Sequence, residues 1–297
     1  MKRSGVQKIR HLIKKQFSEP LSLADMAKHA FVSPFHFQRI FKESTGESPT
    51  QYLTRVRLEA AAHTILTGPQ QSMLAVALDC GYNSLEHFSR AFKKAYGVSP
   101  SAFRDLPEAE KIQLLQTRSQ RNDIDFNVFN ADNIAAVNAR DMPIEVVKLP
   151  AYQVITLPTT LASLQAIEDR FEQLMQWASA RDLVNQSTEF FGLVMDYPLF
   201  TALDKCHYLV AMTVTETPDI ADEMQAITLP AATYARIPVR LPINEMMQDM
   251  TLFWKIWLPQ SGYRIKHETA LHWPQLSLQQ TPFCANRHHL FIQLDPA

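Results

Sequence analysis

Apolar residues recur at helical spacing through the first third of the chain. Four segments carry such a stripe, with apolar positions three or four residues apart: 23–30, 34–45, 73–80 and 84–96. Ser33 followed by Pro34 is typical of a helix N-terminus, while Gly46 and Gly97 are typical of helix ends. The pattern predicts two pairs of short helices, each pair joined by a tight turn.

The second helix pair repeats the first. A shift of 51 residues superposes positions 37–52 on 88–103 with seven identities in sixteen positions, including a Phe-x-Arg-x-Phe-Lys run. Upstream of Phe37 the shift is 50 residues, which places Ala27 on Ala77. Such a duplication is typical of the helix-turn-helix, in which the second helix lies in the major groove of DNA.

Each second helix has an apolar and a polar face. At about 100° per residue, Phe37 and Phe41 share a face and Arg39 lies opposite, and Phe88 and Arg90 are arranged in the same way. An outward Arg can bind the O6 and N7 atoms of guanine, although it is also an ordinary solvated charge. Its repetition on both helices favours a role in reading DNA.

The second half of the chain contains a different repeat. A shift of 80 residues places Leu149-Pro150-Ala151 on Leu229-Pro230-Ala231, and Trp177 on Trp257. In each copy a strand-like stretch precedes an amphipathic helix and two more strands, with helices predicted at 161–181 and 243–257 and the later strands at 189–195, 208–215, 270–273 and 289–294. A βαββ unit that occurs twice predicts an antiparallel sheet.

Charge divides the chain at the same place. Residues 1–121 hold 18 Lys and Arg against 10 Asp and Glu, whereas residues 122–297 hold 11 against 20. A basic half is typical of a domain that meets a polyanion.

The patterns together predict a multidomain protein of α and α+β class. Residues 1–112 form an all-α double helix-turn-helix domain, residues 113–141 a polar linker, and residues 142–297 an α+β domain of two βαββ repeats.

Other features exclude several classes of protein. The apolar runs are much shorter than the roughly 20 residues of a membrane-spanning helix. Lys and Arg interrupt the apolar positions of residues 6–17, so we expect a helix there and no signal peptide. We therefore expect a cytoplasmic protein. Cys80, Cys206 and Cys284 are too far apart for a zinc site. We expect no cofactor and no metal.

Three stretches of the basic half closely resemble the signature of the AraC/XylS family of transcription regulators: Ala77-Leu-Asp-Cys-Gly81-Tyr82, Phe88-Ser-Arg90-Ala-Phe92-Lys93-Lys94, and Gly97-Val-Ser99-Pro100-Ser101-Ala-Phe103-Arg104. The resemblance covers about residues 6–106. It implies seven helices with a long one at 49–66, double-stranded DNA as a partner, and RNA polymerase as a second partner in activation. The two reading helices would lie about one DNA turn, roughly 34 Å, apart.

The resemblance also implies which residues contact DNA. The base-reading positions of the family fall on Phe35, Gln38 and Arg39 in the first reading helix and on Glu86, Ser89 and Arg90 in the second. Their chemistry fits this role, since Gln can read adenine, Arg guanine, Phe a thymine methyl and Glu the amino group of cytosine. We expect Lys42, Lys93 and Lys94 to contact phosphates.

The acidic half resembles the GyrI-like small-molecule-binding domain, most closely at Trp254-Lys-Ile-Trp257-Leu258-Pro259-Gln-Ser261-Gly262-Tyr263. With the DNA-binding domain first, the chain resembles the Rob-type branch of the AraC/XylS family. This implies an aromatic-lined groove between the two repeats, often with a Glu for cationic ligands. Counting along the family pattern places that Glu at His272, so we expect an apolar or aromatic effector that is neutral or anionic.

The predicted ligand-binding residues are Phe171, Tyr197, Tyr208, Trp254, Trp257 and His272, and three more aromatic residues are candidates: Trp177, Phe190 and Trp273. The alternative is that these side chains form the core of the domain, which is the commoner fate of aromatic residues at helix and strand spacing. For His272 the alternative is a packed strand residue.

The sequence lacks the common catalytic motifs, among them the phosphate-binding loop, the dinucleotide fingerprint and the zinc-protease helix. We therefore expect a regulator and not an enzyme, one that activates transcription and responds to a small-molecule effector. Two alternatives for the acidic half are a small-molecule hydrolase with His272 as its base, and a protein-interaction module.

Overall fold

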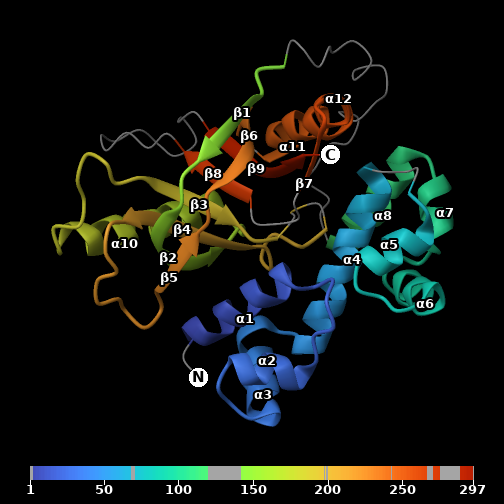
Figure 1. Ribbon diagram of the computed structural model, residues 1–297, viewed down its shortest axis with the longest axis horizontal. Coiled ribbons are helices and arrows are strands. Elements are labelled where there is room, and N and C mark those ends of the chain that lie inside the picture. The colour runs from blue at the N-terminus through green and yellow to red at the C-terminus, as the bar shows by residue number, and fades with distance from the viewer. Residues whose placement is uncertain are drawn as a thin grey trace. The chain divides into compact units, whose positions relative to one another are not determined.

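The computed structural model describes residues 3–67, 71–119, 142–196, 198, 200–241, 243–265, 270–274 and 288–296. It divides into two compact units, residues 1–118 and 119–297 (Figure 1). Most of the linker predicted at 113–141 lies outside the described residues, but its first part is helical, because α8 continues past residue 112 to Ser119.

The first unit is all helical. Its elements are α1 (Arg3–Lys15), α2 (Leu23–His29), α3 (Pro34–Thr45), α4 (Pro49–Thr67), α5 (Met73–Asp79), α6 (Leu85–Tyr96), α7 (Pro100–Asp105) and α8 (Glu108–Ser119). Ser33 and Ser84 accept a hydrogen bond from the backbone three residues later, and Gly46 and Gly97 end α3 and α6 at positive φ. The predicted double helix-turn-helix is confirmed.

Aromatic residues hold each helix pair together. In the first repeat, Phe41 lies 5.5 Å between ring centroids from both Phe37 and Tyr52, in edge-to-face contacts. In the second, Phe92 contacts Phe88 at 5.6 Å and Phe103 at 5.5 Å. Burial of these rings fixes the rotation of α3 and α6, because each helix turns the side that carries them toward the core.

The second unit contains one nine-stranded antiparallel sheet. Its strands are β1 (Glu145–Leu149), β2 (Tyr152–Thr160), β3 (Phe190–Val194), β4 (His207–Val214), β5 (Gln225–Leu229), β6 (Ala232–Val239), β7 (Tyr263–Ile265), β8 (Ala270–Pro274) and β9 (His288–Pro296). The spatial order is β1-β6-β9-β8-β3-β4-β2-β5, and β7 pairs with β9. The pattern of apolar residues does not predict the three-residue strand β7.

The 80-residue repeat explains this strand order. Shifting β1 and β3 by 80 residues gives the bounds of β5 and β8, and the same shift carries β2 onto β6 and β4 onto β9 to within a few residues. The order therefore reads the same from both ends, and the two repeats meet where β3 pairs with β8. This arrangement confirms the predicted α+β fold of two repeats, but each repeat has two strands before its helix, so the unit is ββαββ and the predicted βαββ was one strand short.

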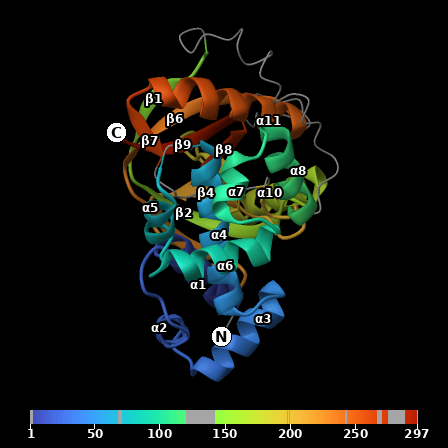
Figure 2. The ribbon, with the colours of Figure 1, turned by 90° about the vertical axis from the view of Figure 1, so that its right-hand side faces the viewer.

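Helices cover one face of the sheet. Helix α10 (Leu164–Ser179) packs on β2 and β4, and α11 (Ile243–Leu252) packs on β6, along which it runs in Figure 2. A second cluster of buried residues lies on the opposite face and includes Val154, Leu193, Leu209, Leu271 and Phe291. Alternate residues of each strand therefore serve two different apolar layers.

The helix predicted at 243–257 is not regular to its end. After α11 the chain forms a five-residue π-helix, Phe253–Trp257, before the short α12 (Leu258–Gln260). Pro259 has no N–H to bond to the carbonyl four residues earlier, and the N–H of Leu258 bonds instead to the carbonyl of Phe253. The wider turn accommodates Pro259 and lets the rings of Phe253 and Trp257 stack.

In the part of the chain that the structure describes, no helix is both long and apolar enough to cross a membrane. The same residues contain no group of three or more His, Cys, Asp or Glu side chains that could hold a metal ion. Cys80 and Cys206 are buried thiols and neither forms a disulfide, and Cys284 lies outside the described residues.

Candidate nucleic-acid interface and ligand pocket

Helix α3 presents the predicted reading residues to solvent. With Phe37 and Phe41 fully buried, the helix exposes Phe35, Gln38, Arg39 and Lys42. The ring of Phe35 is 82% exposed, which is unusual for a large aromatic side chain. The structure brings these four residues onto one outward face.

Helix α6 is arranged in the same way. Glu86, Arg90, Lys93 and Lys94 are exposed, whereas Ser89 is half-buried beside them. Each reading helix pairs its arginine with a carboxylate one turn away: Arg39 with Glu43 at 3.0 Å, and Arg90 with Glu86 at 3.3 Å. Both pairs are mostly exposed, so they hold the guanidinium groups weakly and leave them able to bind another partner.

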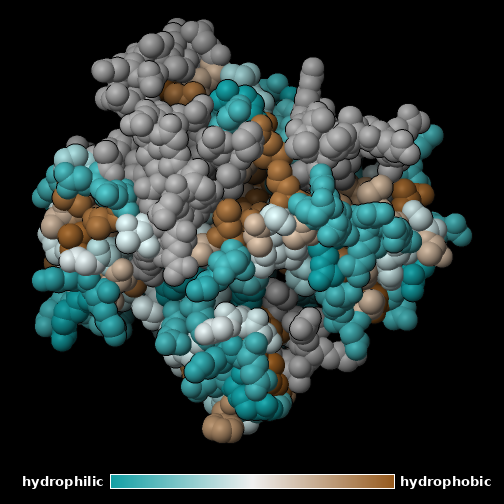
Figure 3. Space-filling view, turned by 180° about the vertical axis from the view of Figure 1, so that it is seen from behind, coloured by the Kyte–Doolittle hydropathy of each residue, from teal (hydrophilic) through white to brown (hydrophobic). Residues whose placement is uncertain are grey.

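The turns that precede the two reading helices differ in one respect. Gly81 adopts φ 77° in the second turn, and Phe31, at the equivalent position of the first, adopts φ 55°. Only Gly adopts this backbone conformation without steric cost. Phe31 is also 94% exposed, so no packing in its own unit compensates for the strain. On the face of the molecule that Figure 3 shows, the coloured surface is mainly hydrophilic with small hydrophobic spots.

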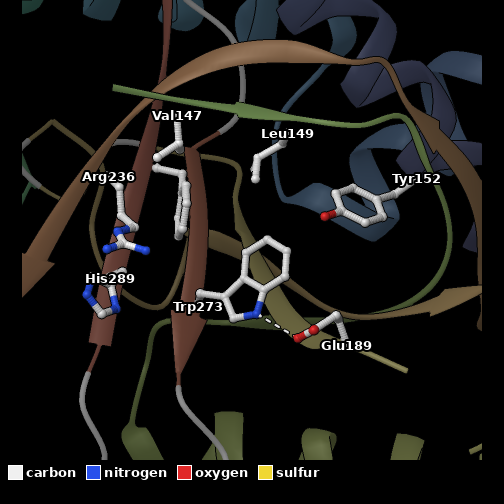
Figure 4. Close-up of a pocket in the computed structure, with 8 residues that line it drawn as sticks. Val147, Leu149, Tyr152, Glu189, Arg236, Trp273 and His289 are labelled. Atoms are coloured by element: carbon white, nitrogen blue, oxygen red, sulfur yellow. Dashed lines mark hydrogen bonds between the residues drawn. The ribbon is translucent and has the colours of Figure 1, made fainter. Parts of the chain in front are cut away.

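A pocket lies on the face of the sheet opposite α10 and α11. Its volume is about 250 Å³, and it is lined by Val147, Leu149, Tyr152, Glu189, Arg236, Trp273, His289 and Phe291 (Figure 4). Trp273 forms its centre, stacked on Phe191 at 4.3 Å between ring centroids and 6.1 Å from Tyr152. The walls can therefore hold a flat apolar group.

Charged groups border this aromatic centre. An oxygen of Glu189 accepts a hydrogen bond from the indole N–H of Trp273 at 3.2 Å. Arg236 pairs with Glu145 at 2.8 Å. Burial, and secondarily the charge of Glu189, raise the pKa of Tyr152, which therefore keeps its hydroxyl proton at neutral pH.

Comparison with known proteins matches both units to families. Residues 26–105 match a family described as a helix-turn-helix domain, and residues 142–272 match the GyrI-like small molecule binding domain. The chain carries an AraC-type helix-turn-helix domain followed by a GyrI-like domain.

Individual relatives match the helix-turn-helix domain. An uncharacterized HTH-type transcriptional regulator of Haemophilus influenzae is 45% identical over 82 residues, which are 28% of this chain and 27% of the relative. The right origin-binding protein of Escherichia coli is 37% identical over 90 residues, which are 30% of this chain and 31% of that protein. The chain therefore matches less than a third of the length of these relatives.

A solved structure, described as a transcriptional regulator from Chromobacterium violaceum with AraC-type DNA-binding domains, is 29% identical. The alignment covers 35% of this chain and 94% of the chain of that structure, with a TM-score of 0.31.

The GyrI-like domain places His272 away from the pocket. Neighbouring residues of a strand point to opposite faces, and on β8 it is Trp273 that faces the pocket. His272 is buried on the helix-covered face, where Nδ1 lies 2.8 Å from the hydroxyl of Tyr208 and Nε2 lies 2.9 Å from Nδ1 of His288. His272 therefore lies on the opposite side of the sheet from this pocket, and its contact with a ligand stays a prediction.

Burial determines the charge of His272. Desolvation, helped by the neighbouring His288, lowers the pKa of His272 from 6.5 to about 3, so the ring is neutral at physiological pH. Tyr208, whose pKa burial raises, packs its ring over Gly192, where a Cβ atom would collide with it. The three polar side chains satisfy one another inside the core.

The other predicted ligand residues are also placed in the core or its margin. Phe171 of α10 and Tyr208 of β4 are buried between that helix and the sheet, and Trp254 and Trp257 pack in the cluster formed by α11 with β6 and β9. Tyr197 lies outside the described residues. Of the wider set of aromatic candidates, Trp273 lines the pocket, whereas Phe190 and Trp177 belong to the α10 cluster.

Glu189, the carboxylate of the pocket, was not predicted from the sequence. This residue directly precedes β3, in the first repeat, whereas the resemblance pointed to the second repeat. The antiparallel pairing of β3 with β8 brings Glu189 to the pocket, because it places the residue before β3 near the end of β8. The expectation of a neutral or anionic effector rested on His272 alone and did not include Glu189; the charge of the effector stays a prediction.

Proposed function

We propose that this protein is a transcription regulator that binds double-stranded DNA through α3 and α6 and a small-molecule effector through the pocket of its GyrI-like domain. The observation that carries the DNA part is the equivalence of the two helices. Both expose an arginine at the same position of a duplicated unit, opposite a buried pair of Phe side chains. Arginine at the centre of an outward helix face is suited to bind guanine.

The pocket supports the effector part. It has an aromatic centre and a few charged groups at its border, which is the usual composition of a small-molecule site, and its volume of about 250 Å³ suits a small ligand. It also lies in the domain whose family binds small molecules. We propose that the ligand acts as an effector by changing the affinity for DNA or the contact with RNA polymerase, and that the regulation is activation.

Selection from a random-sequence duplex pool tests the DNA part. The full chain should enrich a site with two short conserved blocks whose centres lie about one helical turn apart, because each reading helix enters one major groove. Enrichment of no sequence over the starting pool would contradict sequence-specific binding. Transcription by RNA polymerase in vitro from a promoter that contains the selected site, with and without this protein, would test activation.

The hydrolase alternative depended on His272 as a base. A general base must reach the substrate, and this ring is buried on the covered face with both nitrogens in contact with side chains. The geometry therefore favours ligand binding over hydrolysis at that residue.

A further inference from the structure

The polar groups of the pocket are separated into two ends. In Figure 4, Arg236 and His289 lie on one side of Trp273, and Glu189 and Tyr152 lie on the other. One end thus presents a guanidinium and an imidazole, and the other a carboxylate. The aromatic centre connects the two.

Glu189 is suited to meet a cation. Its carboxylate has no ion-pair partner among the residues that the structure describes, and its side chain is exposed to the pocket. The indole N–H of Trp273 donates to one carboxylate oxygen, which fixes the orientation of the group without neutralising it. A ligand ammonium here would gain a charge-assisted hydrogen bond.

Arg236 is suited to meet an anion. Guanidinium carries five N–H donors in a planar fork, and Glu145 contacts the group at Nη2. The Arg236 side chain remains 40% exposed, so further donors are within reach of the pocket. The imidazole of His289 lines the same end.

We infer that the pocket takes a bifunctional aromatic molecule with an amine at one end and a carboxylate at the other. The ring would lie against Trp273 and Phe291, the ammonium at Glu189 and the carboxylate at Arg236. This inference rests on the proposed function, since it names the class of effector for the same site.

Desolvation explains why both charges are needed. A ligand that fills the pocket removes water from both ends, and a charged group that loses water without gaining a partner is destabilised. A purely cationic ligand pairs with Glu189 and covers the Arg236 end, where Glu145 stays the partner of the guanidinium. A purely anionic ligand gives Arg236 a second acceptor but covers Glu189 without bringing it a cation. The bifunctional molecule gives a cation to Glu189 and a second acceptor to Arg236.

The test is calorimetric titration of the full chain with four probes that share one aromatic body. They are para-(aminomethyl)phenylacetate, which carries both charges, para-methylphenylacetate, para-methylbenzylamine and the uncharged para-methylbenzyl alcohol. We expect the doubly charged probe to bind at least about tenfold more tightly than each of the others, since one well-placed charge-assisted hydrogen bond contributes about that factor.

Variants assign the preference to the two ends. Glu189→Gln should reduce the affinity for the doubly charged probe to that of the phenylacetate, and Arg236→Gln should reduce it to that of the benzylamine. Glu172→Gln and Arg170→Gln make the same chemical changes on α10, on the covered side of the sheet, and should leave all four affinities unchanged. Circular dichroism of each variant checks that it folds.

The outcomes separate this inference from the proposed function. Binding of no probe, or equal or tighter binding of a singly charged probe, overturns the inference. Loss of the preference in the α10 variants as well would overturn the assignment to Glu189 and Arg236. Titration of the same preparation with the selected DNA site tests the proposed function independently. If the chain binds this DNA but prefers the benzylamine, the proposed function stands and the proposed class of ligand is wrong.

Discussion

Two residues at one turn position are expected to respond oppositely to substitution. A Cβ atom added to Gly81 would lie 2.7 Å from the carbonyl oxygen of Phe17 and 2.9 Å from Nε of Arg57. At φ 77° a side chain is also strained. Gly81→Ala should therefore lower the free energy of unfolding by about 2 to 4 kcal/mol, measured by chemical denaturation of the full chain followed in the helical circular dichroism band.

Phe31→Gly should do the reverse. Removing the side chain relieves the cost of its left-handed backbone, which stabilises the folded chain by about 1 to 2 kcal/mol. The greater freedom of Gly in the unfolded chain destabilises the folded chain by about 0.5 to 1 kcal/mol. We expect a net rise of up to about 1 kcal/mol in the free energy of unfolding. A fall would mean that the exposed ring makes a stabilising contact. If the strained ring serves DNA binding, affinity for the selected site falls while stability rises.

His272 should make the second unit sensitive to acid. Its pKa is about 3 in the folded chain against 6.5 for an unperturbed His, so between these values the unfolded chain binds a proton that the folded chain does not. His272 therefore leaves stability unaffected above pH 6.5 and lowers it as the pH falls toward 3, by up to about 1.4 kcal/mol per pH unit. Urea denaturation at a series of pH values should give a shallower loss for His272→Gln, and parallel curves would contradict this account.

At the scale of elements, the two reading helices should contribute separately to specificity. Arg39→Ala and Arg90→Ala should each cost about 1 to 3 kcal/mol at the selected site and relax the preference at one base pair. Both arginines form only exposed ion pairs, so folding should change by well under that amount. Fluorescence anisotropy with cognate and random duplexes measures the effect, and Arg181→Ala in the second unit is the control.

Lys93→Ala should behave differently from the arginine variants. A phosphate contact carries no sequence information, so this change should weaken binding to cognate and random DNA alike and reduce the slope of log affinity against log salt by about one unit. Unchanged cognate affinity in both arginine variants would show that another face of the domain reads DNA.

The elements themselves could be predicted because their signals are local. Ser33, Pro34 and Gly46 mark the ends of α3 within a dozen residues, and the duplications reveal the two repeats. The pocket could not be predicted in this way, because on a strand an error of one position exchanges the two faces. Selecting His272 in place of Trp273 moved the expected site from the open face to the buried one. The π-helix at Phe253–Trp257 could not be predicted either, because its hydrogen bonds depart from the spacing of the α-helix, and Pro259 was the sign of it in the sequence.

At the scale of the whole molecule, the first unit should fold and bind DNA alone. Its helices pack on one another, and the structure divides the chain after Arg118. Helix α8 extends to Ser119, so a fragment of residues 1–119 keeps the whole helix, whereas one of residues 1–112 ends inside it and should be less helical. Thermal melting and anisotropy of both fragments test this. A folded 1–119 fragment that binds no DNA bound by the full chain would show that the second unit is required.

The palindromic order of the sheet limits how many effector molecules one chain can hold. Two identical repeats would create two equivalent pockets, as in a symmetric dimer. Fusion into one polypeptide allows the copies to diverge, and here Trp273, His289 and Phe291 have Leu193, Leu209 and Ala211 as their counterparts 80 residues earlier. The aromatic and polar side chains of the site come from both repeats, Tyr152 and Glu189 from the first and Trp273 and Arg236 from the second, at positions that are not equivalent. The expected stoichiometry is therefore one effector per polypeptide.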